Sequence, residues 1–139
     1  MKRSLSEILK KASAQKKVAD RVGILTHNDT ATLRKVLKYT FSEKVTFNQL
    51  PEGSPPYKPN SLVDQENVLF AETRRLYLFT DGGNPGLQQA RKEQLFIEIL
   101  ENVDPEDAKL LIGMKDKKFP DEYKGITKSV VEKAFPGLL

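Results

Sequence analysis

The stretch from Asn84 to Lys118 constrains the fold most, because residues that start and stop helices follow one another closely in it. Asn84 precedes Pro85, a pair typical of an N-cap and the first helical position. Apolar residues then recur at helical spacing as far as Val103, with charged residues between them. These apolar positions are Leu87, Ala90, Leu95, Ile97, Ile99 and Leu100. We therefore predict an amphipathic helix that begins at Asn84 and Pro85 and ends near Val103.

The second half of this stretch repeats the same signals. Asp104 and Pro105 again form a cap and a first helical position, and acidic residues follow in the first turn, where the helix dipole favours negative charge. Pro120 prevents continuation at the other end. The last turn is predicted to hold three lysines that complement the dipole: Lys115, Lys117 and Lys118.

A similar pattern occurs near the N-terminus. When residues 24–25 are aligned with 99–100, Asp29 falls on Asp104 and the apolar positions of the following segments coincide. One interpretation is a pair of stacked helical-repeat-like units that offer a concave protein-binding surface. The other, which we favour, is that two capped amphipathic helix pairs align by chance.

The length of 139 residues suits one domain with its own core, and we predict a single helical domain over residues 1–139. It comprises a basic N-terminal helical unit (1–41), a proline-rich strap (42–63) and a C-terminal helical unit (64–139). The predicted fold class is mainly all-α, a compact bundle of about six helices with an extended strap.

Several functional classes are disfavoured by composition. The chain has no cysteine and one histidine, so thiolate and multi-histidine metal sites are excluded. No apolar run is long enough to span a bilayer, and the N-terminus lacks the pattern of a signal peptide. No catalytic or phosphate-binding constellation stands out. We expect no enzyme activity, no cofactor, no metal and no membrane association, and a cytoplasmic location.

The positive charge lies at the N-terminus. The net charge is +4, whereas residues 1–21 alone carry seven basic and two acidic residues, so the remainder is close to neutral. Ser4 and Glu7 have the spacing of a capping box, and apolar residues follow at helical intervals, which predicts one amphipathic helix with a cationic face. This face either binds anions such as nucleic acid or is a solvated surface. The candidate anion-binding residues here are Lys10, Lys11, Lys16, Lys17 and Arg21.

A turn at residues 27–29 leads into a further helix, predicted from apolar residues at helical spacing. His27 stands at this turn. With no neighbouring nucleophile or second ligand, we interpret it as a capping or surface residue rather than a general base. After this helix, the alternation from Lys44 to Leu50 is typical of a short strand or an extended segment.

Prolines are concentrated between Leu50 and Asn60, which excludes a helix there. Pro56 and Pro59 have the spacing of proline-rich ligands, and Tyr57 lies between them, so these three residues are candidates for docking a partner. We favour the alternative, a structural strap that packs across helices.

Residues 64–80 are predicted to form a central helix whose C-terminal end is apolar on nearly all sides and therefore buried. Arg74 and Arg75 interrupt it, so they either form internal ion pairs, which we favour, or bind a phosphate or a stacked base together with Tyr77. Residues 81–83, Asp-Gly-Gly, predict a turn with positive φ.

The C-terminal segment predicts one short helix. Thr127 is its expected N-cap, apolar residues follow as far as Phe135, and Pro136 with Gly137 ends it. Leu138 and Leu139 then either pack into the core, which we favour, or form an apolar docking tail.

A resemblance to a known protein family rests on five segments of the sequence. They are Ser4–Lys10, Leu50–Gly53 with Pro55–Pro59, Glu72–Phe79, Val103–Leu111 with Lys115–Lys118, and Ala134–Leu138. Together they resemble a family of small proteins of unknown function from T4-like marine and cyanobacterial tailed phages, over nearly the whole chain. The resemblance implies a phage protein located in the cytoplasm of an infected bacterial host. It implies no activity, so no functional residue is transferred by it.

Two functional hypotheses follow. The first is a non-enzymatic adaptor that binds a phage or host protein through its helical surface. The second is an accessory nucleic-acid-binding protein that uses the N-terminal lysines together with Arg74 and Arg75, with an affinity that falls steeply with salt.

Overall fold

A computed structural model describes residues 5–47, 50–59, 73–81, 83 and 86–139 of the chain. Every regular element within these residues is helical, which confirms the predicted all-α class. The α-helices are α1 (Leu5–Ser13), α2 (Val18–His27), α3 (Ala31–Phe41), α5 (Gln89–Asn102), α6 (Pro105–Lys115) and α7 (Lys128–Ala134). Two short 3-10 helices are η1 (Thr73–Phe79) and η2 (Asp121–Tyr123).

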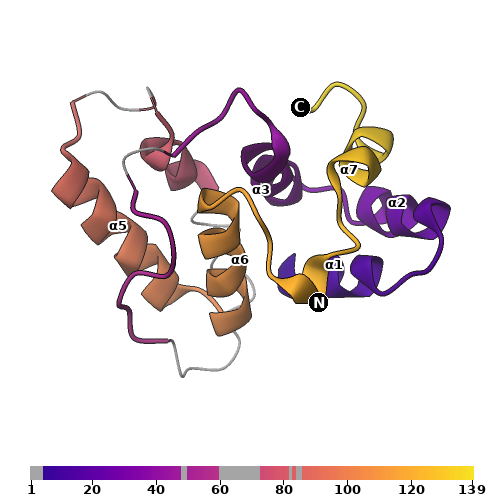
Figure 1. The fold of residues 1–139 in the computed structure, drawn as a ribbon, viewed down its shortest axis with the longest axis horizontal. Helices are drawn as coiled ribbons and strands as arrows, with labels where there is room; N and C mark the ends of the chain where they lie inside the picture. The colour runs from indigo at the N-terminus through magenta and orange to yellow at the C-terminus, as the bar shows by residue number, and fades with distance from the viewer. Residues whose placement is uncertain (1–4, 48–49, 60–72, 82, 84–85) are drawn as a thin grey trace.

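The helices form two groups with α3 between them (Figure 1). At one end of the molecule, α5 and α6 lie side by side, and α3 packs against α6. At the other end, α2 packs against both α1 and α7, and α1 also contacts η2 and α6. The first and last described helices therefore belong to the same end of the molecule.

The predicted N-terminal helix is divided in two. The apolar face predicted for it is buried in α1, but α1 ends at Ser13 and α2 begins only at Val18. Ser13 Oγ accepts a hydrogen bond from the Gly125 N–H at 2.8 Å. Arg21 then donates to the carbonyls of Gln15 (2.7 Å) and Gly125 (3.3 Å), which fixes the turn. The prediction of one helix through residues 1–21 is wrong because these contacts with a distant loop stabilise a break.

The turn between α2 and α3 lies where it was predicted, but its cap differs. The Thr30 side chain accepts a hydrogen bond from the Leu33 N–H at 3.1 Å, so Thr30 and not Asp29 is the N-cap. Asp29 instead pairs with Arg34, with 2.6 Å between Oδ1 and Nε. His27 is the exposed last residue of α2, a surface position as expected.

The C-terminal end of α3 is held by a lysine from beyond α6. Lys117 Nζ donates to the carbonyl oxygens of Tyr39 (2.6 Å), Ser42 (2.8 Å) and Val45 (2.7 Å). Lys117 has a φ of 62°, in the left-handed region, directly after α6 has ended at Lys115. Lys117 and Lys118 therefore do not belong to the last turn of α6, contrary to the prediction, because the chain turns to bring Lys117 under α3.

Residues 42–47 contain no strand, so of the two alternatives predicted for this region the extended segment is the correct one within the residues described. The Asp81 N–H donates to the Thr46 carbonyl at 2.8 Å, and the Thr46 hydroxyl donates to the Asp81 carboxylate at 2.5 Å. These bonds tie the segment after α3 to the turn after η1.

The two helices predicted from Asn84 to Lys118 are present, but the first begins later and the second ends earlier than predicted. The side chain of Asp104 accepts a hydrogen bond from the Glu106 N–H (2.9 Å), and Pro105 is the first residue of α6, as predicted. The predicted end near Val103 is also confirmed. However, α5 begins at Gln89, so the start predicted at residues 84–85, which lie outside the described residues, is wrong. Gly86 favours non-helical backbone just before α5.

The two units with similar spacing do not pack alike. α5 packs against α6, whereas α2 packs against α1 and α7, and α3 packs against α6. The helical-repeat interpretation is therefore wrong, and the alignment of the two patterns is a chance similarity of capped amphipathic helices.

The described part of the predicted central helix is the 3-10 helix η1, and residues 64–72 lie outside the described residues. Leu76 and Phe79 are fully buried, as predicted, but Tyr77 is 47% exposed. A 3-10 helix places residues three apart on one side, so Leu76 and Phe79 share the buried side and Tyr77 does not. The prediction that this end of the helix is buried on nearly all sides is therefore wrong, because Tyr77 faces solvent.

Gly83, in the turn after η1, is required by space and not by a positive φ. A Cβ at this position would lie 2.0 Å from the Tyr77 carbonyl oxygen. The φ of Gly83 is outside the left-handed region, so the predicted positive φ is wrong there, and Gly82 lies outside the described residues.

The C-terminal prediction is confirmed. The Thr127 side chain accepts a hydrogen bond from the Val130 N–H at 3.3 Å, and α7 ends before Pro136. Leu138 and Leu139 are half-buried and pack against the core, as the favoured alternative predicts.

Candidate functional site

The centre of the strap, residues 50–59, is fastened to the end of α6 by a buried lysine. Lys115 is only 5% exposed, and its Nζ donates to the carbonyl oxygens of Pro51 (2.8 Å) and Gly53 (2.9 Å) and to the Asp116 carboxylate (2.5 Å). An ammonium group has three N–H donors, and here all three are used inside the protein. Lys115 is therefore a structural clamp for the strap.

Two further contacts fix the path of the strap. The Gly53 N–H donates to the second Asp116 oxygen at 3.1 Å, and Gly53 has a φ of 87°, which favours glycine at this bend. The Lys58 N–H donates to Glu101 Oε2 on α5 at 2.8 Å. This geometry confirms the interpretation of the proline-rich segment as a strap across helices.

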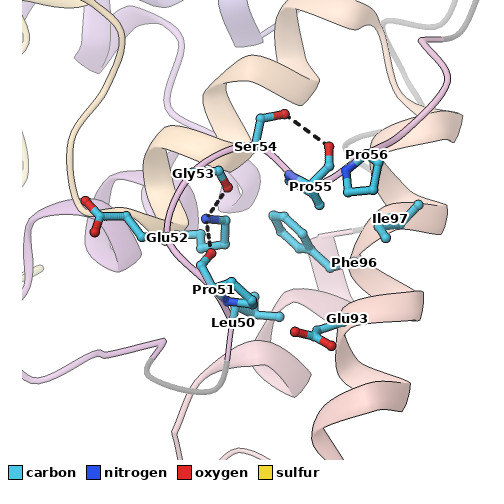
Figure 2. A pocket seen from close by; sticks show the side chains of 11 residues that line it. Leu50, Pro51, Glu52, Gly53, Ser54, Pro55, Pro56, Glu93, Phe96 and Ile97 are labelled. Atoms are coloured by element: carbon cyan, nitrogen blue, oxygen red, sulfur yellow. Dashed lines mark hydrogen bonds between the residues drawn. The ribbon is translucent and has the colours of Figure 1, made fainter.

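A pocket of about 330 Å³ lies between the strap and α5, and we call it the strap pocket (Figure 2). Residues 50–56 of the strap form one wall, and Glu93, Phe96 and Ile97 of α5 form the other. Lys115 also lines the pocket. The Phe96 ring points into the arch of the strap and is supported by an edge-on contact with Phe79, with ring centroids 5.3 Å apart. The pocket is therefore largely apolar, and Phe96 at its centre is packed against the core.

The lining of the strap pocket is mainly apolar. Its lining combines proline rings, an aromatic ring and aliphatic side chains with one carboxylate, Glu93, on the α5 side. Apolar walls with few polar groups are typical of binding pockets, and a volume near 300 Å³ is at the lower end of their range. The pocket is large enough for one or two side chains.

The three residues predicted to dock a partner lie on different surfaces. Pro56 forms part of the strap pocket wall, whereas Tyr57 is half-buried and lines a shallower cleft over α6 and Phe119. Pro59 is exposed. The structure therefore brings Pro56 into the pocket but does not present the three residues as one ligand.

The residues predicted to bind anions also differ in their surroundings and do not all face solvent. Lys10 pairs with Glu106 (3.3 Å) and Glu122 (3.5 Å). Partial burial lowers the pKa of Lys10, but the two carboxylates outweigh this effect, and the pKa lies above its ordinary value. Arg21 is occupied by the carbonyls that fix the turn between α1 and α2. The predicted residues at this end that remain exposed are Lys11, Lys16 and Lys17.

The arginines of η1 lie away from this cluster, because η1 packs near α5 and not near α1 (Figure 1). Arg75 is half-buried, and the side chain of Arg74 lies outside the described residues. A single cationic surface that joins the N-terminal lysines to η1 is therefore not formed by the described residues.

A second polar feature is buried between α1, α6 and η2. Asp107 Oδ1 accepts a hydrogen bond from the Ser6 N–H at 2.9 Å, while Asp107 Oδ2 and the Tyr123 hydroxyl have no hydrogen-bond partner within the described part of the chain. Burial raises the pKa of Asp107 from 3.8 to about 6, and burial likewise raises the pKa of Tyr123. Buried polar atoms without a hydrogen-bond partner lower the stability of the folded protein.

Two kinds of feature are absent from the residues that the structure describes. No group of three or more His, Asp or Glu side chains is placed to hold a metal ion. None of the described helices combines the length and hydrophobicity that a membrane crossing requires.

The structure describes a small all-α protein with a largely apolar pocket between the strap and α5. The chain matches a family of unknown function, DUF6433, over residues 8–121, and it belongs to this family. No curated protein and no solved structure matches it. The family match includes the strap and both helices that flank the pocket.

Sequence reasoning missed the strap pocket. Helix-dipole reasoning accounts for Lys115 as a residue of a last helical turn and does not indicate its contact with the strap. The available signal was the pair Phe96 and Ile97, since two adjacent apolar residues widen the apolar face of a helix beyond one stripe. Residues that cover the additional face must come from elsewhere in the chain, and here they come from the strap.

Proposed function

We propose that this protein is a non-enzymatic phage accessory protein, an adaptor that binds a phage or host protein by seating a short segment of it in the strap pocket. The observation that carries this proposal is the pocket itself, whose strap wall is fastened by Lys115 and Asp116 before any partner binds. A preformed site loses little conformational entropy on binding, which favours short peptide ligands.

A phage origin, and with it the cytoplasm of an infected bacterial host, is supported by the resemblance of the five segments to phage proteins. The same resemblance suggests partners among phage or host proteins.

The proposal is tested by affinity capture with tagged protein from a lysate of infected host cells, with and without nuclease. Ile97→Lys places a charge in the pocket wall at a half-buried position. Val18→Lys is the matched control, because Val18 is 40% exposed on α2 at the other end of the molecule (Figure 1). Circular dichroism verifies that both variants are folded.

We expect one discrete partner that the wild-type protein and Val18→Lys retain after nuclease and that Ile97→Lys loses. Equal capture by Ile97→Lys would show that the pocket is not the binding site. Capture that disappears with nuclease would instead favour nucleic acid as the partner.

The nucleic-acid alternative now depends on fewer residues. Lys11, Lys16 and Lys17 are exposed around the turn between α1 and α2 and are free of the contacts that occupy Lys10 and Arg21. Under this alternative, replacing the three lysines by glutamine abolishes binding to single- or double-stranded DNA in a gel-shift assay at low salt. Binding that persists in this variant would exclude the N-terminal lysines as the site.

A further inference from the structure

The strap pocket offers few hydrogen-bond donors. Of the seven strap residues in its wall, three are prolines, which have no N–H. The N–H groups of Leu50 and Gly53 already donate, to the Phe47 carbonyl (3.1 Å) and to the Asp116 carboxylate (3.1 Å). The ammonium of Lys115 is saturated by three protein oxygens. An anionic occupant such as a phosphate would therefore find no available cation in this wall.

The charge that the pocket does offer is negative. Glu93 lies on α5 next to Leu50 at one end of the pocket, and its side chain is half-buried (Figure 2). Glu93 forms no hydrogen bond or ion pair with any residue that the structure describes. The other carboxylate of the wall, Glu52, is exposed and points away from the Phe96 ring (Figure 2). Glu93 is therefore the group left to recognise a charged occupant.

We infer that the strap pocket selects a partner segment in which an apolar side chain stands next to a lysine or an arginine. The apolar side chain fills the cavity against Phe96 and Ile97, and the cation pairs with Glu93 at its edge. This inference rests on the proposed adaptor function and specifies the partner's chemistry. A partly exposed ion pair adds little affinity, but it discriminates strongly between charges of opposite sign.

The inference is tested with a library of short random peptides displayed on yeast. The library is selected with tagged wild-type protein, Glu93→Lys and Ile97→Lys. Glu98→Lys is the matched control, because Glu98 is a half-buried glutamate of the same helix that does not line the pocket. The most enriched peptide is then synthesised, and its affinity for the wild-type protein and for Glu93→Gln is measured.

We expect the wild-type protein and Glu98→Lys to enrich apolar residues beside Lys or Arg, and Glu93→Lys to enrich apolar residues beside Asp or Glu. Ile97→Lys should enrich neither. Glu93→Gln should weaken binding of the synthesised peptide by about two- to fivefold, and high salt should remove this difference.

Three outcomes would overturn the inference. They are enrichment of the same basic peptides by Glu93→Lys, enrichment of apolar peptides without a charge preference, and no enrichment above the Ile97→Lys background. The adaptor function is judged separately, by whether Ile97→Lys loses the captured partner protein. A retained pocket-dependent partner without charge preference would refute the specificity and leave the adaptor function intact.

Discussion

Replacing Asp107 by asparagine should remove a pH dependence of stability that the wild-type protein has. Asp107 lies in the first turn of α6 with no exposed surface, and only one of its oxygens has a hydrogen-bond partner among the described residues. Burial raises its pKa from 3.8 to about 6, although the Ser6 N–H acts in the opposite direction. The folded protein therefore binds the proton of Asp107 more tightly than the unfolded chain does.

The sign and size of the effect follow from linkage. Folding raises the pKa of Asp107. The contribution of this group to the stability of the folded state is therefore fully present below its unfolded pKa of 3.8, and it is lost as the pH rises to about 6. The two pKa values differ by about 2.2, which corresponds to about 3 kcal/mol. About 2 kcal/mol of this loss falls between about pH 4.5 and about pH 7.5.

Urea unfolding at a series of pH values measures this effect. Asparagine keeps an oxygen for the Ser6 N–H but does not ionise, so Asp107→Asn should gain about 2 kcal/mol relative to the wild-type protein across that pH range. Asp20→Asn is the matched control, because Asp20 is exposed on α2, and it should follow the wild-type curve. A difference between Asp107→Asn and the wild-type protein that stays constant with pH would refute the reasoning.

Four further substitutions test the packing by the free energy of unfolding in urea. Lys117→Met removes the donor for three carbonyls at the end of α3 and should destabilise the protein by about 2–3 kcal/mol. An unchanged free energy of unfolding would show that water replaces the lysine. Gly125→Ala should cost about 1–3 kcal/mol, because its Cβ would lie 2.5 Å from the Ser13 carbonyl oxygen, while Gly23→Ala, in open space on α2, should stabilise by about 0.5–1 kcal/mol. Equal effects of the two alanines would contradict the close contact at Gly125. Tyr123→Phe removes a buried hydroxyl that has no partner in the described structure, so it should leave stability unchanged or raise it by up to about 1 kcal/mol, and a clear loss would reveal a hidden hydrogen bond.

The features that sequence reasoning predicted correctly are local. The caps Asp104 and Thr127 act on N–H groups two or three residues away, so residue order alone contains the information. The buried face of α1 is equally local, since helical spacing brings its apolar residues together.

The features that it missed depend on residues distant in the chain. The break between α1 and α2 is stabilised by Gly125, and the end of α3 by Lys117. The strap pocket likewise needs Lys115 to meet the carbonyl of Pro51. Charge patterning assigned these two lysines to a helix dipole, because a single sequence does not show which distant carbonyl a lysine reaches.

The contact of Gly125 with Ser13 and Arg21 has a consequence for synthesis on the ribosome. Gly125 and α7 are made after every other described helix, yet they stabilise the break between α1 and α2 and pack against α2. Helices α3, α5 and α6 and the strap are complete earlier in translation. The N-terminal end of this protein is therefore expected to acquire its final packing last, so a nascent chain stalled before residue 125 would lack α7 and leave the side of α2 that α7 covers exposed to chaperones.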